Sequence, residues 1–161
     1  MMKRLFILTI GCQMNVYDSE RMALMLAPME YVETGDMASA DVILVNTCAI
    51  RAKAEQKLFS FLGRLAEEKI RRPRLTIGVG GCVAQQEGKN IIRRAPHVDL
   101  VFGTDAVHRL PALLARVEEK RERIVDVRME GSPFSAPRKP EGMLPAGDAT
   151  GPVSRFASIM Q

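Results

Sequence analysis

The sequence predicts an α/β protein built on a doubly wound, mostly parallel sheet of about five strands. Two observations support this prediction. Short apolar runs rich in β-branched residues, bounded by Gly, Asn and Asp, suit strands that are buried on both faces. These runs alternate along the chain with segments of helical period, which is typical of parallel sheets with helices on both sides.

Four runs are clear strands and two are weaker. The clear strands are predicted at residues 4–10, 41–45, 75–79 and 98–102, and the weaker ones at 31–34 and 123–127. One helix is predicted to open at Asn15, with Asp18 completing a capping arrangement, and to run to about Met29. Two further helices show as apolar stripes, over residues 54–65 and 110–117.

The composition is typical of a globular domain that has neither a membrane span nor a disulfide scaffold. The chain has 161 residues, 47% hydrophobic and 26% charged, which is typical of a globular domain with a real core. Its longest early apolar run, residues 5–10, is too short for a membrane span or a signal peptide. Three cysteines exclude a disulfide scaffold and favour the reducing cytoplasm. The net charge of +4 permits a nucleic-acid partner without requiring one, and the basic run at 69–74 is interpreted as a solvated helix end.

The composition changes near Met129. Five of the nine prolines and four of the twelve glycines lie in residues 129–161. We therefore predict an α/β domain over 1–128 and a linker over 129–152. The apolar segment 153–161 resembles the first strand of a further domain and is expected to pack poorly on its own.

Each cysteine directly follows a predicted strand and precedes a helix. Cys12, Cys48 and Cys82 follow the first, third and fourth strands. In a flavodoxin-like order, 2-1-3-4-5, these three strands are neighbours about 4.8 Å apart, and their carboxyl ends share one edge of the sheet. Thiols separated by more than thirty residues in the sequence are thus expected to gather at one place.

Converging thiolates suit a soft metal or an iron–sulfur cluster. Three cysteines without a fourth ligand favour a cubane cluster with one iron open to an exogenous group. A zinc site remains an alternative, with His108 as its fourth ligand, whereas His97 precedes its strand and lies at the wrong edge. A metal-free flavodoxin-like interaction domain, in which the cysteines only pack, is the other alternative. No histidine adjoins a cysteine in sequence, so cysteine catalysis is not favoured.

The segments around the cysteines resemble the N-terminal domain of the radical-SAM methylthiotransferases, most closely the MiaB-type tRNA enzymes. The resemblance covers about residues 3–128. The matching segments are GCQMN at 11–15 with DSE at 18–20, NTCAIR at 46–51 with AE at 54–55, GCVAQ at 81–85, and the stretch from 98 to 104.

The resemblance implies that Cys12, Cys48 and Cys82 hold an auxiliary [4Fe–4S] cluster whose open iron carries the sulfur to be inserted. It implies a methylthio group added at C2 of N6-isopentenyladenosine in tRNA. A radical-SAM barrel with a second [4Fe–4S] cluster on a CxxxCxxC motif, and a TRAM domain that helps hold the tRNA, would complete the enzyme. Relatives that act on threonylcarbamoyl-adenosine tRNA or on a ribosomal-protein aspartate are the alternative substrate classes.

This sequence holds three cysteines and no CxxxCxxC motif. We therefore expect a fragment, with 153–161 as the start of a truncated barrel, that binds the cluster but does not turn over alone. We also expect a monomer in the cytoplasm. Arg51 and Lys53 lie at the predicted cluster edge, where they are interpreted as solvated first-turn charges rather than phosphate contacts.

Overall fold

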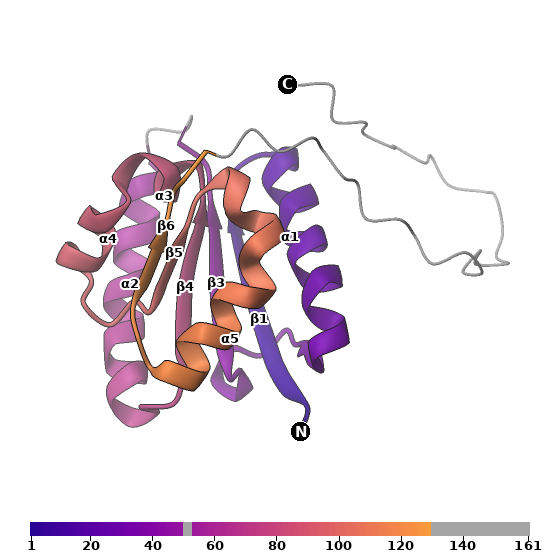
Figure 1. Cartoon of the computed structure of the whole chain (residues 1–161). Helices are drawn as coiled ribbons and strands as arrows, with labels where there is room; N and C mark the ends of the chain where they lie inside the picture. The colour runs from indigo at the N-terminus through magenta and orange to yellow at the C-terminus, as the bar shows by residue number, and fades with distance from the viewer. Residues whose placement is uncertain (50–52, 130–161) are drawn as a thin grey trace, which may run out of the picture. The chain divides into compact units, whose positions relative to one another are not determined.

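The predicted α/β architecture is confirmed, with six strands rather than about five. The computed structural model describes residues 1–49 and 53–129. These form one all-parallel sheet in the order β2-β1-β3-β4-β5-β6 (Figure 1). The strands are β1 Lys3–Ile10, β2 Tyr31–Glu33, β3 Val42–Thr47, β4 Thr76–Gly81, β5 Leu100–Phe102 and β6 Ile124–Asp126. The two weakly predicted strands are β2 and β6, at the two edges of the sheet.

The helices connect the strands. They are α1 Gln13–Leu26, α2 Ala54–Arg71, α3 Cys82–Glu87, α4 Lys89–Arg94 and α5 Leu110–Lys120, with 3₁₀ turns at Ala27–Met29, Met37–Ser39 and Thr104–Arg109. The prediction that Asn15 caps the first helix is wrong. The N-cap is Cys12, and the helix ends at Leu26, before the 3₁₀ turn that contains Pro28.

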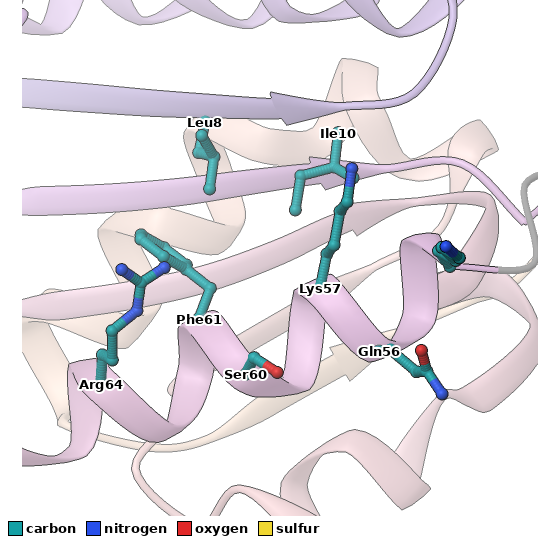
Figure 2. A pocket seen from close by; sticks show the side chains of 8 residues that line it. Leu8, Ile10, Gln56, Lys57, Ser60, Phe61 and Arg64 are labelled. Atoms are coloured by element: carbon teal, nitrogen blue, oxygen red, sulfur yellow. The ribbon is translucent and has the colours of Figure 1, made fainter.

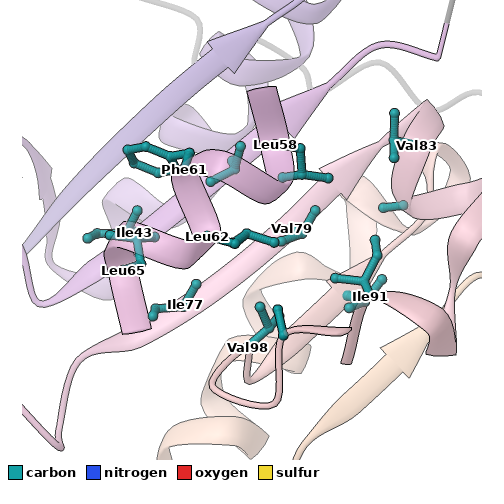
Figure 3. Close-up of a cluster of buried hydrophobic side chains, with 14 of the residues drawn as sticks. Ile43, Leu58, Phe61, Leu62, Leu65, Ile77, Val79, Val83, Ile91 and Val98 are labelled. Carbon is teal, nitrogen blue, oxygen red and sulfur yellow. The ribbon is translucent and has the colours of Figure 1, made fainter. Parts of the chain in front are cut away.

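Two apolar layers enclose the sheet. α1 and α5 cover one face, whereas α2, α3 and α4 cover the other (Figure 1). Figure 3 shows the layer under α2, where the apolar stripe predicted from the sequence packs on β3 and β4. Leu58, Leu62 and Leu65 of this stripe are fully buried. Among the described residues, no helix is both long enough and apolar enough to cross a membrane.

The connection from β2 to β3 contains a short 3₁₀ turn, Met37–Ser39, and no α-helix. β2 also pairs with only the first three residues of β1, from Lys3 to Leu5. The later part of β1 therefore has a sheet neighbour on the β3 side alone. On the α2 side of the sheet, Phe6, Leu8 and Ile10 pack against the apolar layer under α2 but stay half-buried, because the β2–β3 connection supplies no helix to cover them.

β6 is anchored to the rest of the sheet by a carboxylate. Asp126 is 3% exposed and accepts two hydrogen bonds from Arg109, each 2.9 Å long, in a bidentate arrangement. The Arg128 guanidinium and backbone N–H donate to the same carboxylate. Burial works to raise the pKa of Asp126, but the hydrogen bonds from Arg109 and Arg128 outweigh it and hold the pKa far below its usual range.

Replacing Asp126 with asparagine is expected to lower the free energy of unfolding at neutral pH by roughly 2 kcal/mol, because charged hydrogen bonds to Arg109 are lost. A depressed carboxyl pKa contributes stability that is present above the unfolded-state value, about 3.9, and is lost as the pH falls toward the folded-state value. Urea unfolding at pH 7 and at pH 3 measures this. The difference between wild type and Asp126→Asn should shrink at pH 3, and an equal difference at both values would contradict this account.

The linker predicted at 129–152 and the segment at 153–161 fall, apart from Met129, outside the described residues. The proposed boundary at residue 128 therefore stays a prediction.

Candidate functional site

The carboxyl ends of three adjacent strands form the candidate site. The sheet register places Ile10 beside Thr47, and Thr47 beside Gly81. Cys12 follows Ile10 by two residues, whereas Cys48 and Cys82 come directly after Thr47 and Gly81. The prediction that the cysteines follow three neighbouring strands at one edge is therefore confirmed by the topology.

Cys12 is half-buried and caps the N-terminus of α1. Its backbone N–H and its thiol both donate to Oδ1 of Asn15, at 3.2 and 3.4 Å. Burial works to raise the pKa of the Cys12 thiol, but hydrogen bonds to the sulfur from the backbone N–H groups of Asn15 and Met14 and from the Cys48 thiol outweigh it. The pKa is lowered overall, as expected for a thiol at a helix N-terminus.

Cys48 is 2% exposed, and its backbone N–H extends the sheet by donating to the Ile10 carbonyl at 2.9 Å. The chain at Gly11 approaches it closely. A Cβ at position 11 would lie 2.6 Å from Cys48 Cβ and 2.3 Å from Asn15 Oδ1. A side chain at Gly11 would therefore separate Cys12 from Cys48.

Cys82 is half-buried and is the first residue of α3. Gly81 before it has φ +94°, a conformation that favours glycine, which turns the chain from β4 directly into the helix. A Cβ at Gly81 would lie 2.2 Å from the Thr47 carbonyl oxygen. The tight turn thus holds the start of α3 against the end of β3.

Cys12 and Cys48 are in contact, whereas Cys82 does not complete a ligand set with them in this structure. Among residues 1–49 and 53–129, no three His, Cys, Asp or Glu side chains are grouped so that they could hold a metal ion. The donor chemistry nevertheless fits a soft centre, since all three side chains are thiols at adjacent strand ends.

A buried amide network lies under the two contacting cysteines. Asn46 is fully buried at the end of β3, and its Nδ2 donates to the Asn15 carbonyl at 2.7 Å and to Ser19 Oγ at 3.0 Å. Asn15 Nδ2 donates in return to Asn46 Oδ1 and to the Thr47 carbonyl, both at 3.2 Å. Thr9 and Ser19 close the network with a 2.7 Å hydroxyl contact. The network fixes the start of α1 relative to β3, and so fixes Cys12 relative to Cys48.

This positioning role is not predicted from the sequence. The sequence predicts Asn15 as a helix cap, and otherwise both asparagines belong to the segments that carry the resemblance. Their spacing from the cysteines was the available signal, since Asn15 comes three residues after Cys12 and Asn46 two residues before Cys48.

The two histidines lie apart from a ligand set. His108 is exposed on the 3₁₀ turn after β5, and its Nε2 lies 3.4 Å from Arg109 Nη1. His97 precedes β5, and its Nε2 lies 2.6 Å from the Leu62 carbonyl oxygen. Lys53 is exposed at the N-cap of α2, and Arg51 falls outside the described residues.

Comparison with known proteins gives a family match. Residues 4–103 match the model of a family described as "Uncharacterized protein family UPF0004". Proteins named tRNA-2-methylthio-N(6)-dimethylallyladenosine synthase are similar over nearly the whole chain. The one from Legionella pneumophila (strain Corby) is 51% identical over 163 aligned positions, covering 100% of this chain.

Two further relatives with the same name show the same coverage. The protein of Coxiella burnetii (strain Dugway 5J108-111) is 49% identical over 99% of this chain, and that of Citrifermentans bemidjiense is 43% identical over 99%. The chain spans only 35% of the length of each of these three relatives.

Proposed function

The chain belongs to the family UPF0004, and on this basis we propose that it is the part of a tRNA methylthiotransferase that binds an auxiliary [4Fe–4S] cluster. The single observation that carries the proposal is the position of Cys12, Cys48 and Cys82 at the ends of three adjacent parallel strands. The names of the relatives, each a tRNA-2-methylthio-N(6)-dimethylallyladenosine synthase, support the activity.

In this proposal the three thiolates each hold one iron, and one iron stays open. When bound, the cluster supplies an iron site that can carry an exogenous sulfur atom. The residues of this chain prepare that site in distinct ways. The backbone N–H groups at the start of α1 favour the thiolate form of Cys12. The Asn15–Asn46 amide pair keeps Cys12 and Cys48 together, and the missing side chain at Gly11 allows their close approach.

The substrate we propose is N6-isopentenyladenosine next to the tRNA anticodon, modified at C2. The enzyme that contains this domain would also use S-adenosylmethionine and a second [4Fe–4S] cluster on a radical-SAM barrel, with a TRAM domain to help hold the tRNA. We further propose that it works in the cytoplasm, where cysteine ligands stay reduced.

Anaerobic reconstitution of the 161-residue chain with iron and sulfide tests the cluster directly. About four iron and four sulfide atoms per chain are expected. Cys12→Ser, Cys48→Ser and Cys82→Ser should each lose most of this iron, because each removes one of the three thiolate ligands. Ser60→Ala, a change at an exposed position of α2, is the matched control and should load like wild type.

Two results would overturn the proposal. Tightly held zinc in place of iron would identify a zinc-stabilised module. A chain shown by circular dichroism to be folded that takes up neither metal would leave the cysteines as packing residues.

A further inference from the structure

A hollow of about 450 Å³ lies beside α2, on the side of the sheet where α2 covers β1 only in part. Its apolar floor consists of Leu8 and Ile10 from β1, with Phe61 from α2 (Figure 2). The hollow exists because the β2–β3 connection is too short to supply a covering helix. On this side, β3, β4 and β5 lie under α2, α3 and α4.

The wall of the hollow is cationic. Lys53, Lys57 and Arg64 line it from one flank of α2, and no acidic residue is among its lining residues. All three side chains are exposed. Within the described part of the chain, none of the three forms an ion pair with a carboxylate. In Figure 2 the Lys57 side chain extends toward Ile10, and Arg64 lies against Phe61, with its guanidinium 5.4 Å from the ring centre.

In contrast, cations at the C-terminal end of α2 form ion pairs with carboxylates. Lys69 pairs with Asp99 at 2.7 Å, and Arg72 pairs with Glu68 at 3.2 Å. Arg72 also donates to three backbone carbonyls of the segment before β3. The basic run predicted to be a solvated helix end is therefore largely occupied by structural contacts, whereas the flank from Lys53 to Arg64 keeps its charge available.

Two residues that line the hollow are close to cysteines in the sequence. Ile10 on its floor lies two residues before Cys12, and Lys53 on its wall lies five residues after Cys48. The helix rises about 1.5 Å per residue, so the three cations form a row of roughly 16 Å that ends near the cysteine edge. One end of a polyanion that lies along this row would therefore come near the cysteines.

We propose that Lys53, Lys57 and Arg64 bind the phosphate backbone of the RNA strand that carries the modified nucleotide. For Lys53 this replaces the interpretation from the sequence as a solvated charge, because the structure places it in one row with Lys57 and Arg64. The inference rests on the proposed function, which supplies RNA as the polyanion. Phosphate contacts by Lys and Arg position a nucleic acid without reading its sequence, and each contact adds to the salt dependence of binding. The half-covered face of β1 leaves room for this RNA strand beside α2.

The test is a pair of triple variants of the 161-residue chain. One carries Lys53→Gln, Lys57→Gln and Arg64→Gln. The control carries Lys89→Gln, Arg93→Gln and Lys120→Gln, which removes three exposed cations from α4 and α5 and changes the net charge equally. The probe is a fluorescein-labelled anticodon stem–loop RNA containing isopentenyladenosine, and its dissociation constant is measured by anisotropy over a range of salt concentrations.

The α2 triple variant should bind about tenfold or more weakly at low salt. The slope of log affinity against log salt should fall by about two, since each phosphate contact contributes about 0.7–0.9. The control should keep most of the wild-type slope. The proposal is overturned if the α2 variant binds like wild type, if the control loses as much, or if wild type binds no RNA.

The iron measurement separates these failures from failure of the proposed function. A wild-type chain that loads iron but binds no RNA would overturn only the RNA surface. If the α2 variant keeps its RNA affinity, and amide exchange at α2 slows when the chain is extended to the length of its relatives, the hollow is occupied by protein instead. That result would also overturn the RNA proposal.

Discussion

Gly81→Ala is expected to lower the free energy of unfolding by about 3 kcal/mol or more. Alanine at φ +94° is strained, and its Cβ would lie 2.2 Å from the Thr47 carbonyl oxygen and 2.7 Å from Asn46 Oδ1. Backbone atoms cannot move away cheaply, so β3 and β4 must separate where Cys48 and Cys82 follow them. Urea unfolding followed by circular dichroism measures the loss.

Gly63→Ala is the matched control. Gly63 lies inside α2, and an added Cβ there meets nothing within 4 Å. The same substitution should therefore stabilise the chain by roughly 0.5–1 kcal/mol, because alanine is the better helix former. If both variants change stability by the same amount and in the same direction, the turn at Gly81 is not the strained contact described above.

Asn46→Leu should have a comparable effect on stability and a larger one on the site. The change removes the amide that binds the Asn15 carbonyl, Asn15 Nδ2 and Ser19, and Asn15 Nδ2 keeps only its bond to the Thr47 carbonyl. A buried hydrogen bond contributes about 0.5–1.5 kcal/mol, and three are lost. The start of α1 should then shift relative to β3, and reconstituted iron should fall to well below half of the wild-type content.

Asn90→Leu provides the comparison for this variant, since Asn90 is exposed on α4. Its stability should stay within about 0.5 kcal/mol of wild type, and its iron content should be unchanged. Full iron loading of Asn46→Leu in a folded chain would show that the amide pair does not position the cysteines.

Much of the architecture could be predicted from the sequence because each cysteine lies in a short, recognisable strand–turn–helix segment. The order of the strands followed from the general topology of parallel sheets, and it made β1, β3 and β4 neighbours. The start of α1 was predicted wrongly because Asn15 has the chemistry of a cap. Its side chain instead accepts the Cys12 N–H from inside the first turn, which leaves Cys12 as the cap.

Other features depend on tertiary contacts that a linear pattern does not contain. The Asn15–Asn46 pair joins residues 31 positions apart, and neither periodicity nor spacing indicates that their amides face each other. The cationic hollow arises because the β2–β3 connection contains no α-helix, and the available signal was the short interval between the strands at 31–34 and 41–45. The contact between Cys12 and Cys48 fits the predicted cluster of thiols, whereas the approach of Cys82 stays a prediction.

β6 lies at one edge of the sheet and is the last of its strands to be synthesised. The strands that carry the cysteines are complete once residue 82 has left the ribosome, but β5 gains its outer neighbour only when Ile124–Asp126 emerges. Until then β5 presents an unpaired strand edge, which is a template for pairing with other chains. The Arg109–Asp126 contact can form only after β6 emerges, and a chain that ends before Ile124 would keep an aggregation-prone edge.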